Sequence, residues 1–368
     1  MSSKIIQFAP QFAPWLWEGD IKDFPENDLF PWINKIKNKS IYCYFWPSWD
    51  NNNNMPPNYE YYIILYHEET LINIDWLEKQ RSLCDGIFIV LHNGFSYNYE
   101  LENCYFLQYM NWHKSLEMVR KWWGDQEPNF DNKKYKFSAV CNRLEQMKIF
   151  VITKLLEDAY DNSLLVLGDW LEEKNVNYWL PLSDNPELLS LTNIFRKKYL
   201  GKRIVDSKTK IKINNQRYNS NPYQPIYADA ALHFSLNNFS LSQFDNYIHP
   251  GPEIDEKIFK CLIGGVAFIP CAQFETLKSL KKLGFVFDYN HIDLSFDTTL
   301  PDDERFVKIC NEIDKLNNLE IVDIMSDTKK STLENWKYIT KGGFFDTCEK
   351  NNNITEEKIF DIINGRTY

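Results

Sequence analysis

A glutamate and a lysine stand side by side in the segment "IDEKIFKCLIGGVAFIP". Apolar residues recur behind them at helical spacing and a double glycine ends the run, so Glu256 and Lys257 are predicted to open an amphipathic helix. A helix N-terminus offers free N–H groups and a partial positive charge, which suit a phosphate. Lys257 adds a mobile charge for a diphosphate, and Glu256 can accept hydrogen bonds from ribose hydroxyls. The alternative is a solvated ion pair on an exposed first turn.

Short motifs follow this pair in a fixed order. After "DEKIFKCLIGGVAFI" come "ETLKSLKKLGFVFD", "IDLSFD" and "PDDERF". The run resembles the T-E-K-x-x-x-A-x-x-x-G-x-P-x-I signature and later motifs of GT-B glycosyltransferases such as the fucosyltransferase and exostosin-like groups. It resembles still more closely a set of phage proteins related to them. Asp255 stands where the signature usually has threonine, and aspartate can also cap a helix.

Two other segments extend the resemblance. "FSAVCNRLEQMKIFVITKLLE" is similar to the strand, loop and helix of these enzymes, and "YHEETLINIDWL" is similar to the N-terminal part of the phage set. The resemblance implies that Glu256 holds the ribose of a nucleotide-sugar donor and Lys257 its phosphates. It also implies that Arg143 and Lys148 neutralise the departing diphosphate. Such a cationic clamp can replace a metal, so neither a metal nor a cofactor beyond the donor is expected.

The acceptor side needs a group that can take a proton from a hydroxyl. His67, Glu68 and Glu69 end a predicted strand, and we expect Glu69 to be the general base. The alternative is a solvated strand end. His92 also ends a predicted strand, before Asn-Gly, and is interpreted as a turn residue without a catalytic role. His113 is interpreted as a packed helix residue, and His233 as a core histidine with a hydrogen-bond partner.

Composition excludes some classes of protein and leaves others open. The net charge is −10, so nothing global indicates a nucleic-acid or membrane partner. The eight cysteines form no C-x-x-C pair, and neither a signal peptide nor a transmembrane run is evident, so we expect a cytoplasmic protein, in the host if it is viral. The basic stretch 196–212 is either a solvated edge strand or a contact to DNA phosphates. The second reading rests on a resemblance of architecture to phage enzymes that glycosylate modified DNA bases.

The elements that must position these residues alternate along the chain. Strands are predicted at 40–46, 59–69, 86–94, 102–110, 135–140, 163–169 and 228–236. Two more are predicted, one after each of the two helices in the motif run, and the second of these strands ends at residue 288. Helices are predicted at 73–84, 112–123, 145–157 and 185–200, with two more helical stretches from about 330. Continuous apolar strands between helices indicate parallel sheets covered on both faces. The polar segment 124–134 is interpreted as a linker.

The sequence therefore predicts a GT-B-like α/β fold with two Rossmann-like domains facing a cleft and C-terminal helices. The acceptor domain is expected at 1–130, the nucleotide-sugar domain at 131–340 and a helical tail at 341–368. The predicted activity is transfer of a sugar from a nucleotide donor to a hydroxyl of a glycan, or of a hydroxymethylated base in phage DNA. The alternative is a non-catalytic nucleotide- or carbohydrate-binding protein on the same scaffold.

Overall fold

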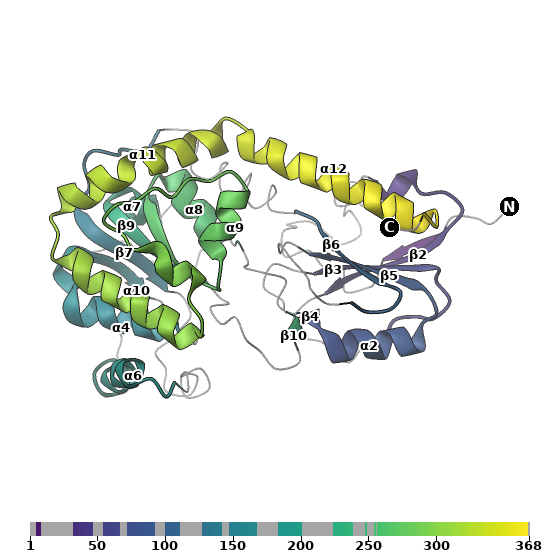
Figure 1. Cartoon of the computed structure of the whole chain (residues 1–368), viewed down its shortest axis with the longest axis horizontal. Helices are drawn as coiled ribbons and strands as arrows, with labels where there is room; N and C mark the ends of the chain where they lie inside the picture. The colour runs from purple at the N-terminus through teal and green to yellow at the C-terminus, as the bar shows by residue number, and fades with distance from the viewer. Residues whose placement is uncertain are drawn as a thin grey trace. The chain divides into compact units, whose positions relative to one another are not determined.

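The chain divides into two compact units, each built on its own parallel sheet (Figure 1). The computed structural model describes residues 5–8, 32–46, 54–66, 72–92, 100–110, 127–141, 147–167, 183–200, 224–237, 247–248, 254 and 256–366. Unit 1 comprises Met1–Ser115, Phe244–Glu253 and Asp346–Tyr368, and unit 2 comprises Leu116–Gln243 and Ile254–Phe345. Compared with the predicted ranges, unit 1 ends its first segment earlier and also includes an internal segment and most of the tail.

The unit 1 sheet has five parallel strands in the order β1-β2-β3-β5-β6. They are β1 (Ile5–Phe8), β2 (Ser40–Trp46), β3 (Tyr61–Tyr66), β5 (Ile87–His92) and β6 (Cys104–Gln108). A separate antiparallel pair joins β4 (Ile72–Asn73) to β10 (Tyr247–Ile248), which is why the internal segment belongs to this unit. The strands that pattern predicts at 40–46, 86–94 and 102–110 are confirmed, with ends shifted by a few residues at most.

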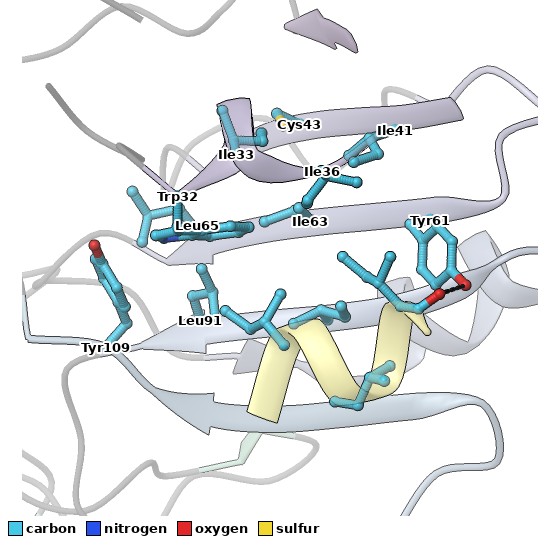
Figure 2. Close-up of a cluster of buried hydrophobic side chains, with 14 residues drawn as sticks. Trp32, Ile33, Ile36, Ile41, Cys43, Tyr61, Ile63, Leu65, Leu91 and Tyr109 are labelled. Atoms are coloured by element: carbon cyan, nitrogen blue, oxygen red, sulfur yellow. Dashed lines mark hydrogen bonds between the residues drawn. The ribbon is translucent and has the colours of Figure 1, made fainter. Parts of the chain in front are cut away.

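Both faces of this sheet are covered. Helix α2 (Ile74–Leu83) packs Trp76 and Leu77 into a cluster with alternate strand residues such as Tyr62 and Phe88. On the other face, the short helix η2 (Ile33–Lys35) and the C-terminal end of α12 (Gly343–Ile363) close a second cluster (Figure 2). The Tyr61 hydroxyl donates to the Ile363 carbonyl at 2.9 Å, which ties the last turn of α12 to the start of β3 (Figure 2).

The unit 2 sheet has four parallel strands in the order β11-β9-β7-β8. They are β7 (Tyr135–Cys141), β8 (Ser163–Leu167), β9 (Ala230–Leu236) and β11 (Ala267–Cys271). The helices of the unit are α4 (Lys148–Asp158), α6 (Pro186–Lys198), α7 (Gln224–Ala228), α8 (Glu256–Gly264), α9 (Thr276–Lys282), α10 (Asp302–Asn317) and α11 (Ile321–Thr340), with short helices η3 (Tyr160–Asn162) and η5 (Leu294–Thr298).

The two faces of the unit 2 sheet are covered by different helices. Helices α4 and α10 pack together on one face, with α6 against α4, whereas α7, α8 and α11 lie on the other (Figure 1). The predicted helices at 145–157 and 185–200 are confirmed as α4 and α6, and Asn185 caps α6 by accepting the Glu187 and Leu188 N–H groups. The predicted helix at 112–123 lies outside the described residues.

The double glycine of the motif run has a specific geometric role. Gly264 is the last residue of α8, and Gly265 follows it with φ of +60°, the left-handed conformation that glycine adopts without strain. A Cβ on Gly265 would lie 2.5 Å from the Pro128 side chain. The helix therefore ends here, and the chain enters β11 two residues later.

The predicted strand at 284–288 is wrong. This segment is irregular, and side chains from α11 satisfy its backbone in place of a neighbouring strand. Asn335 accepts the Val286 N–H at 2.7 Å and donates to the Val286 carbonyl at 2.7 Å. Ser331 accepts the Asp288 N–H at 3.0 Å. The apolar run is buried beside α11, so burial alone accounted for its strand-like pattern.

The architecture is mixed α/β, with two separate parallel sheets that fit a pair of Rossmann-like domains. Within the described ranges, no helix combines the length and apolarity needed to cross a bilayer.

Candidate functional site

The strand order of unit 2 reverses between β7 and β9. From β7 the chain passes through α4 to β8 on one side, and later strands β9 and β11 are added on the opposite side. In open parallel sheets, ligands bind outside the carboxyl ends of the strands at such a reversal. The carboxyl ends of β7 and β9 therefore define the candidate site.

Two helix N-termini reach this edge from opposite faces. Helix α4 leads from β7 into the parallel strand β8, so it runs antiparallel to them and begins at their carboxyl ends. Helix α8 ends two residues before β11, so it also begins at the carboxyl edge. Each N-terminus contributes a partial positive charge, because the helix dipole points its positive end at this edge. The edge is consequently suited to an anion.

The structure assigns the predicted donor residues to this edge where it describes them. Lys148 is the first residue of α4, and its side chain is only 3% exposed. Glu256 is the first residue of α8, although its side chain is not described, and Lys257 follows with a half-buried side chain. Arg143 lies outside the described residues. The start of α8 at the predicted glutamate is confirmed, whereas the donor-binding roles remain predictions.

A buried polar cluster lies under α8. Ser138 on β7 faces His233 on β9, and the hydroxyl and the ring Nδ1 are 2.8 Å apart. The Tyr227 ring lies against the imidazole, with centroids 4.6 Å apart. Burial, and secondarily the nearby Lys260 ammonium, lowers the pKa of His233 to about 3. The histidine is therefore neutral at physiological pH, and its interpretation as a core residue with a hydrogen-bond partner is confirmed.

The later motifs of the run meet on the opposite face of the same sheet. Asp297 of "IDLSFD" accepts the N–H groups of Leu277 and Lys278 at 2.7 and 2.9 Å, so its carboxylate caps α9. Burial raises the pKa of Asp297, although these two hydrogen bonds oppose the shift. Arg305 of "PDDERF" is 1% exposed and pairs with Asp302 at 2.5 Å. Asp297 therefore links η5 to α9, whereas the pair of Arg305 and Asp302 lies within α10.

Sequence reasoning missed one polar residue at the candidate edge. Asn237 follows β9 directly and is 3% exposed. Its Oδ1 accepts the Ser235 hydroxyl at 3.1 Å, and its backbone N–H donates to the Cys271 carbonyl at 3.4 Å. The signal that could have found it is an amide placed immediately after an apolar strand, at the end where ligands bind.

The acceptor residues are described only in part. Glu69, with His67 and Glu68, lies outside the described residues, so its role as a base remains a prediction. His92 is the last residue of β5, buried and paired in register with Gln108 of β6, so it belongs to the strand and not to the turn. Burial lowers the pKa of His92 well below its usual value.

The predicted basic stretch is described only to residue 200. Arg196, Lys197 and Lys198 are exposed in the last turn of α6, where positive charge complements the helix dipole. Lys198 forms an ion pair with Glu157. The contact to DNA remains a prediction. Among the residues described, His, Cys, Asp and Glu side chains form no group of three or more that could hold a metal ion.

Comparisons of the chain with protein-family models, curated proteins and solved structures found no match.

Proposed function

We propose that this protein is a glycosyltransferase that moves a sugar from a nucleotide-sugar donor to an acceptor hydroxyl. The observation that carries the proposal is the reversal of strand order in unit 2, with one helix N-terminus on each side of it. A nucleoside diphosphate has two adjacent phosphates, which two positive helix ends can stabilise together. This supports unit 2 as the donor domain of a GT-B-like enzyme, with Lys148 and Lys257 beside the diphosphate.

The chemistry follows from where charge grows during transfer. As the bond between the sugar and the diphosphate breaks, negative charge accumulates on the leaving phosphate. Helix dipoles fixed in the fold and lysine side chains stabilise that charge without reorganising. Arg143 and Glu256 keep their proposed roles at the diphosphate and the ribose. No metal is assigned a step.

The first experiment measures release of nucleoside diphosphate from a panel of nucleotide sugars, with and without hydroxyl acceptors that include glycans and hydroxymethylated DNA. Acceptor-dependent release supports the transferase. A donor that raises the melting temperature, because it binds only the folded state, but is never consumed supports the non-catalytic alternative. A chain that neither binds nor consumes any donor rejects both.

The proposed base is tested separately with Glu69→Gln, which keeps the shape of the side chain and removes its charge. Transfer should fall by about 10²-fold or more, the usual scale for a lost general base, while donor affinity stays the same. Glu68→Gln is the matched control. Equal activity of Glu69→Gln and the parent chain would remove Glu69 from the mechanism.

A further inference from the structure

One buried polar atom at the candidate edge, Asn237 Nδ2, has no hydrogen-bond partner in the described part of the chain. Asn237 Oδ1 accepts the Ser235 hydroxyl at 3.1 Å, so Nδ2 is the end of the amide that does not contact that hydroxyl. A buried donor left unmet costs about 1–3 kcal/mol. The fold tolerates this cost at the very point where parallel sheets bind ligands.

The strand register places this amide on the same face as α8. Side chains alternate along a strand, so His233, Ser235 and Asn237 share one face of β9. Helix α8 packs against β9, and its Lys260 is close enough to His233 to lower the pKa of the imidazole. The end of β9 therefore carries Asn237 toward the first turn of α8.

The relative lengths of helix and strand locate the amide more closely. Glu256 is four residues before Lys260, or about 6 Å along the helix axis. Asn237 is four residues after His233, or about 13 Å along an extended strand. With Lys260 taken as level with His233, and because α8 runs antiparallel to β9, Asn237 lies several ångströms (roughly 7 Å) beyond the start of α8. The positive end of the α8 dipole faces this region, where it stabilises an anion.

We propose that Asn237 Nδ2 donates a hydrogen bond to a diphosphate oxygen of the nucleotide bound at the carboxyl ends of β7 and β9. The inference rests on the proposed function for the identity of the ligand as a nucleoside diphosphate. The amide offers donors, and the neighbouring helix ends and Lys257 offer positive charge, so the matching group is an anionic oxygen. Asn237 thereby positions the diphosphate against the N-terminus of α8.

The test is isothermal titration calorimetry on the full chain, with UDP, GDP, ADP and CDP as probes and inorganic pyrophosphate as a second probe. Asn237→Leu should weaken the tightest nucleotide and pyrophosphate by a similar factor of about tenfold or more. Its melting temperature without ligand should stay close to that of the parent chain, because removal of the unmet Nδ2 donor offsets the lost hydrogen bond from Ser235. Asn237→Asp is nearly isosteric and should weaken binding further, since its carboxylate repels phosphate.

The matched control is Gln80→Met in unit 1. Gln80 is likewise a buried amide, and its Oε1 accepts the Met55 N–H at 2.7 Å. Like Asn237 Nδ2, its Nε2 is buried and has no hydrogen-bond partner among the described residues. The control should bind both probes as the parent chain does. If it loses affinity as Asn237→Leu does, the effect is general and the proposal falls.

The remaining outcomes separate the proposal from the function on which it rests. Unchanged affinity in both Asn237 variants overturns the contact and leaves a transferase possible. If the variants lose nucleotide binding but retain pyrophosphate binding, the proposed contact to the diphosphate is also wrong, because the amide then binds the nucleoside. If the parent chain binds no probe, the contact and the proposed function fall together. If it binds nucleotides but never transfers a sugar, only the function falls.

Discussion

At the scale of single residues, charge near the carboxyl edge of unit 2 serves two purposes. Lys257 is half-buried at the start of α8, where a ligand is proposed, whereas Arg305 is fully buried in an ion pair with Asp302. The motif run contains both residues, yet of the two a ligand role is proposed for Lys257 alone. The motif run therefore includes at least one residue, Arg305, that serves the construction of the unit.

Lys257→Ala should weaken binding of a nucleoside diphosphate by about 1.5–3 kcal/mol, the scale of one charge-assisted hydrogen bond. The matched control is Lys281→Ala, which removes an exposed lysine from α9 in the same unit. Calorimetric titration of both variants measures the difference. If the two variants bind equally well, Lys257 has no part in the donor site.

His233 should make the stability of unit 2 depend on pH. Its folded pKa is about 3 against an ordinary value of 6.5, so in that window the unfolded chain binds a proton that the folded chain does not. Stability should therefore fall by up to about 1.4 kcal/mol per pH unit as the pH drops below 6.5. No such loss occurs above that value, where both states are neutral.

The comparison variant is His233→Gln, whose amide can still bond to the Ser138 hydroxyl. Urea unfolding at about pH 7.5 and about pH 5 should show that the parent chain loses about 2 kcal/mol more than the variant. Identical losses in the two proteins would mean that His233 is protonated in the folded state.

At the scale of helices and strands, the sequence predicted those elements whose stabilising residues lie within the element itself. The strand β2 and the helices α2 and α6 were predicted closely because apolar periodicity and caps lie within each segment. The segment 284–288 was predicted wrongly because its backbone partner, Asn335, lies on a distant helix. The edge that holds the candidate site follows from strand order, which no single segment encodes.

Asp297→Ala should destabilise unit 2 by about 1–3 kcal/mol, because it uncaps α9 and removes a buried acceptor of two backbone N–H groups. Asp293→Ala is the control, since Asp293 also caps a short helix but is exposed. Its cost should be well under half as large. Chemical denaturation of the two variants makes the comparison, and equal costs would contradict the role of Asp297.

At the scale of the whole molecule, the two units are not consecutive pieces of chain. The sequence predicted two domains that meet at the linker 124–134 and a separate helical tail at 341–368, whereas unit 1 also includes Phe244–Glu253 and Asp346–Tyr368. Pairing of β10 with β4 and packing of α12 on the first sheet bring these segments in. Such contacts join residues hundreds of positions apart, so periodicity and composition do not reveal them.

Tyr61→Phe tests the attachment of α12 to unit 1. The variant removes the buried hydrogen bond to the Ile363 carbonyl and should cost about 1–2 kcal/mol. Tyr105→Phe on β6 is the control, because Tyr105 is 41% exposed. Hydrogen exchange should show faster opening of the last turn of α12 in Tyr61→Phe alone. Equal protection in both variants would show that apolar packing holds the helix without this bond.

The attachment of α12 also sets the order of events during synthesis. All strands of the first sheet precede residue 110 in the chain and are synthesised early. Helix α12, which covers Ile41, Ile63 and Ile89, follows roughly 250 residues later. At about 5–20 residues per second, the part of that face that α12 covers stays exposed for on the order of ten to fifty seconds. Exposed apolar surface makes a nascent chain prone to aggregation. The yield of folded protein should therefore depend on chaperones and on the rate of translation.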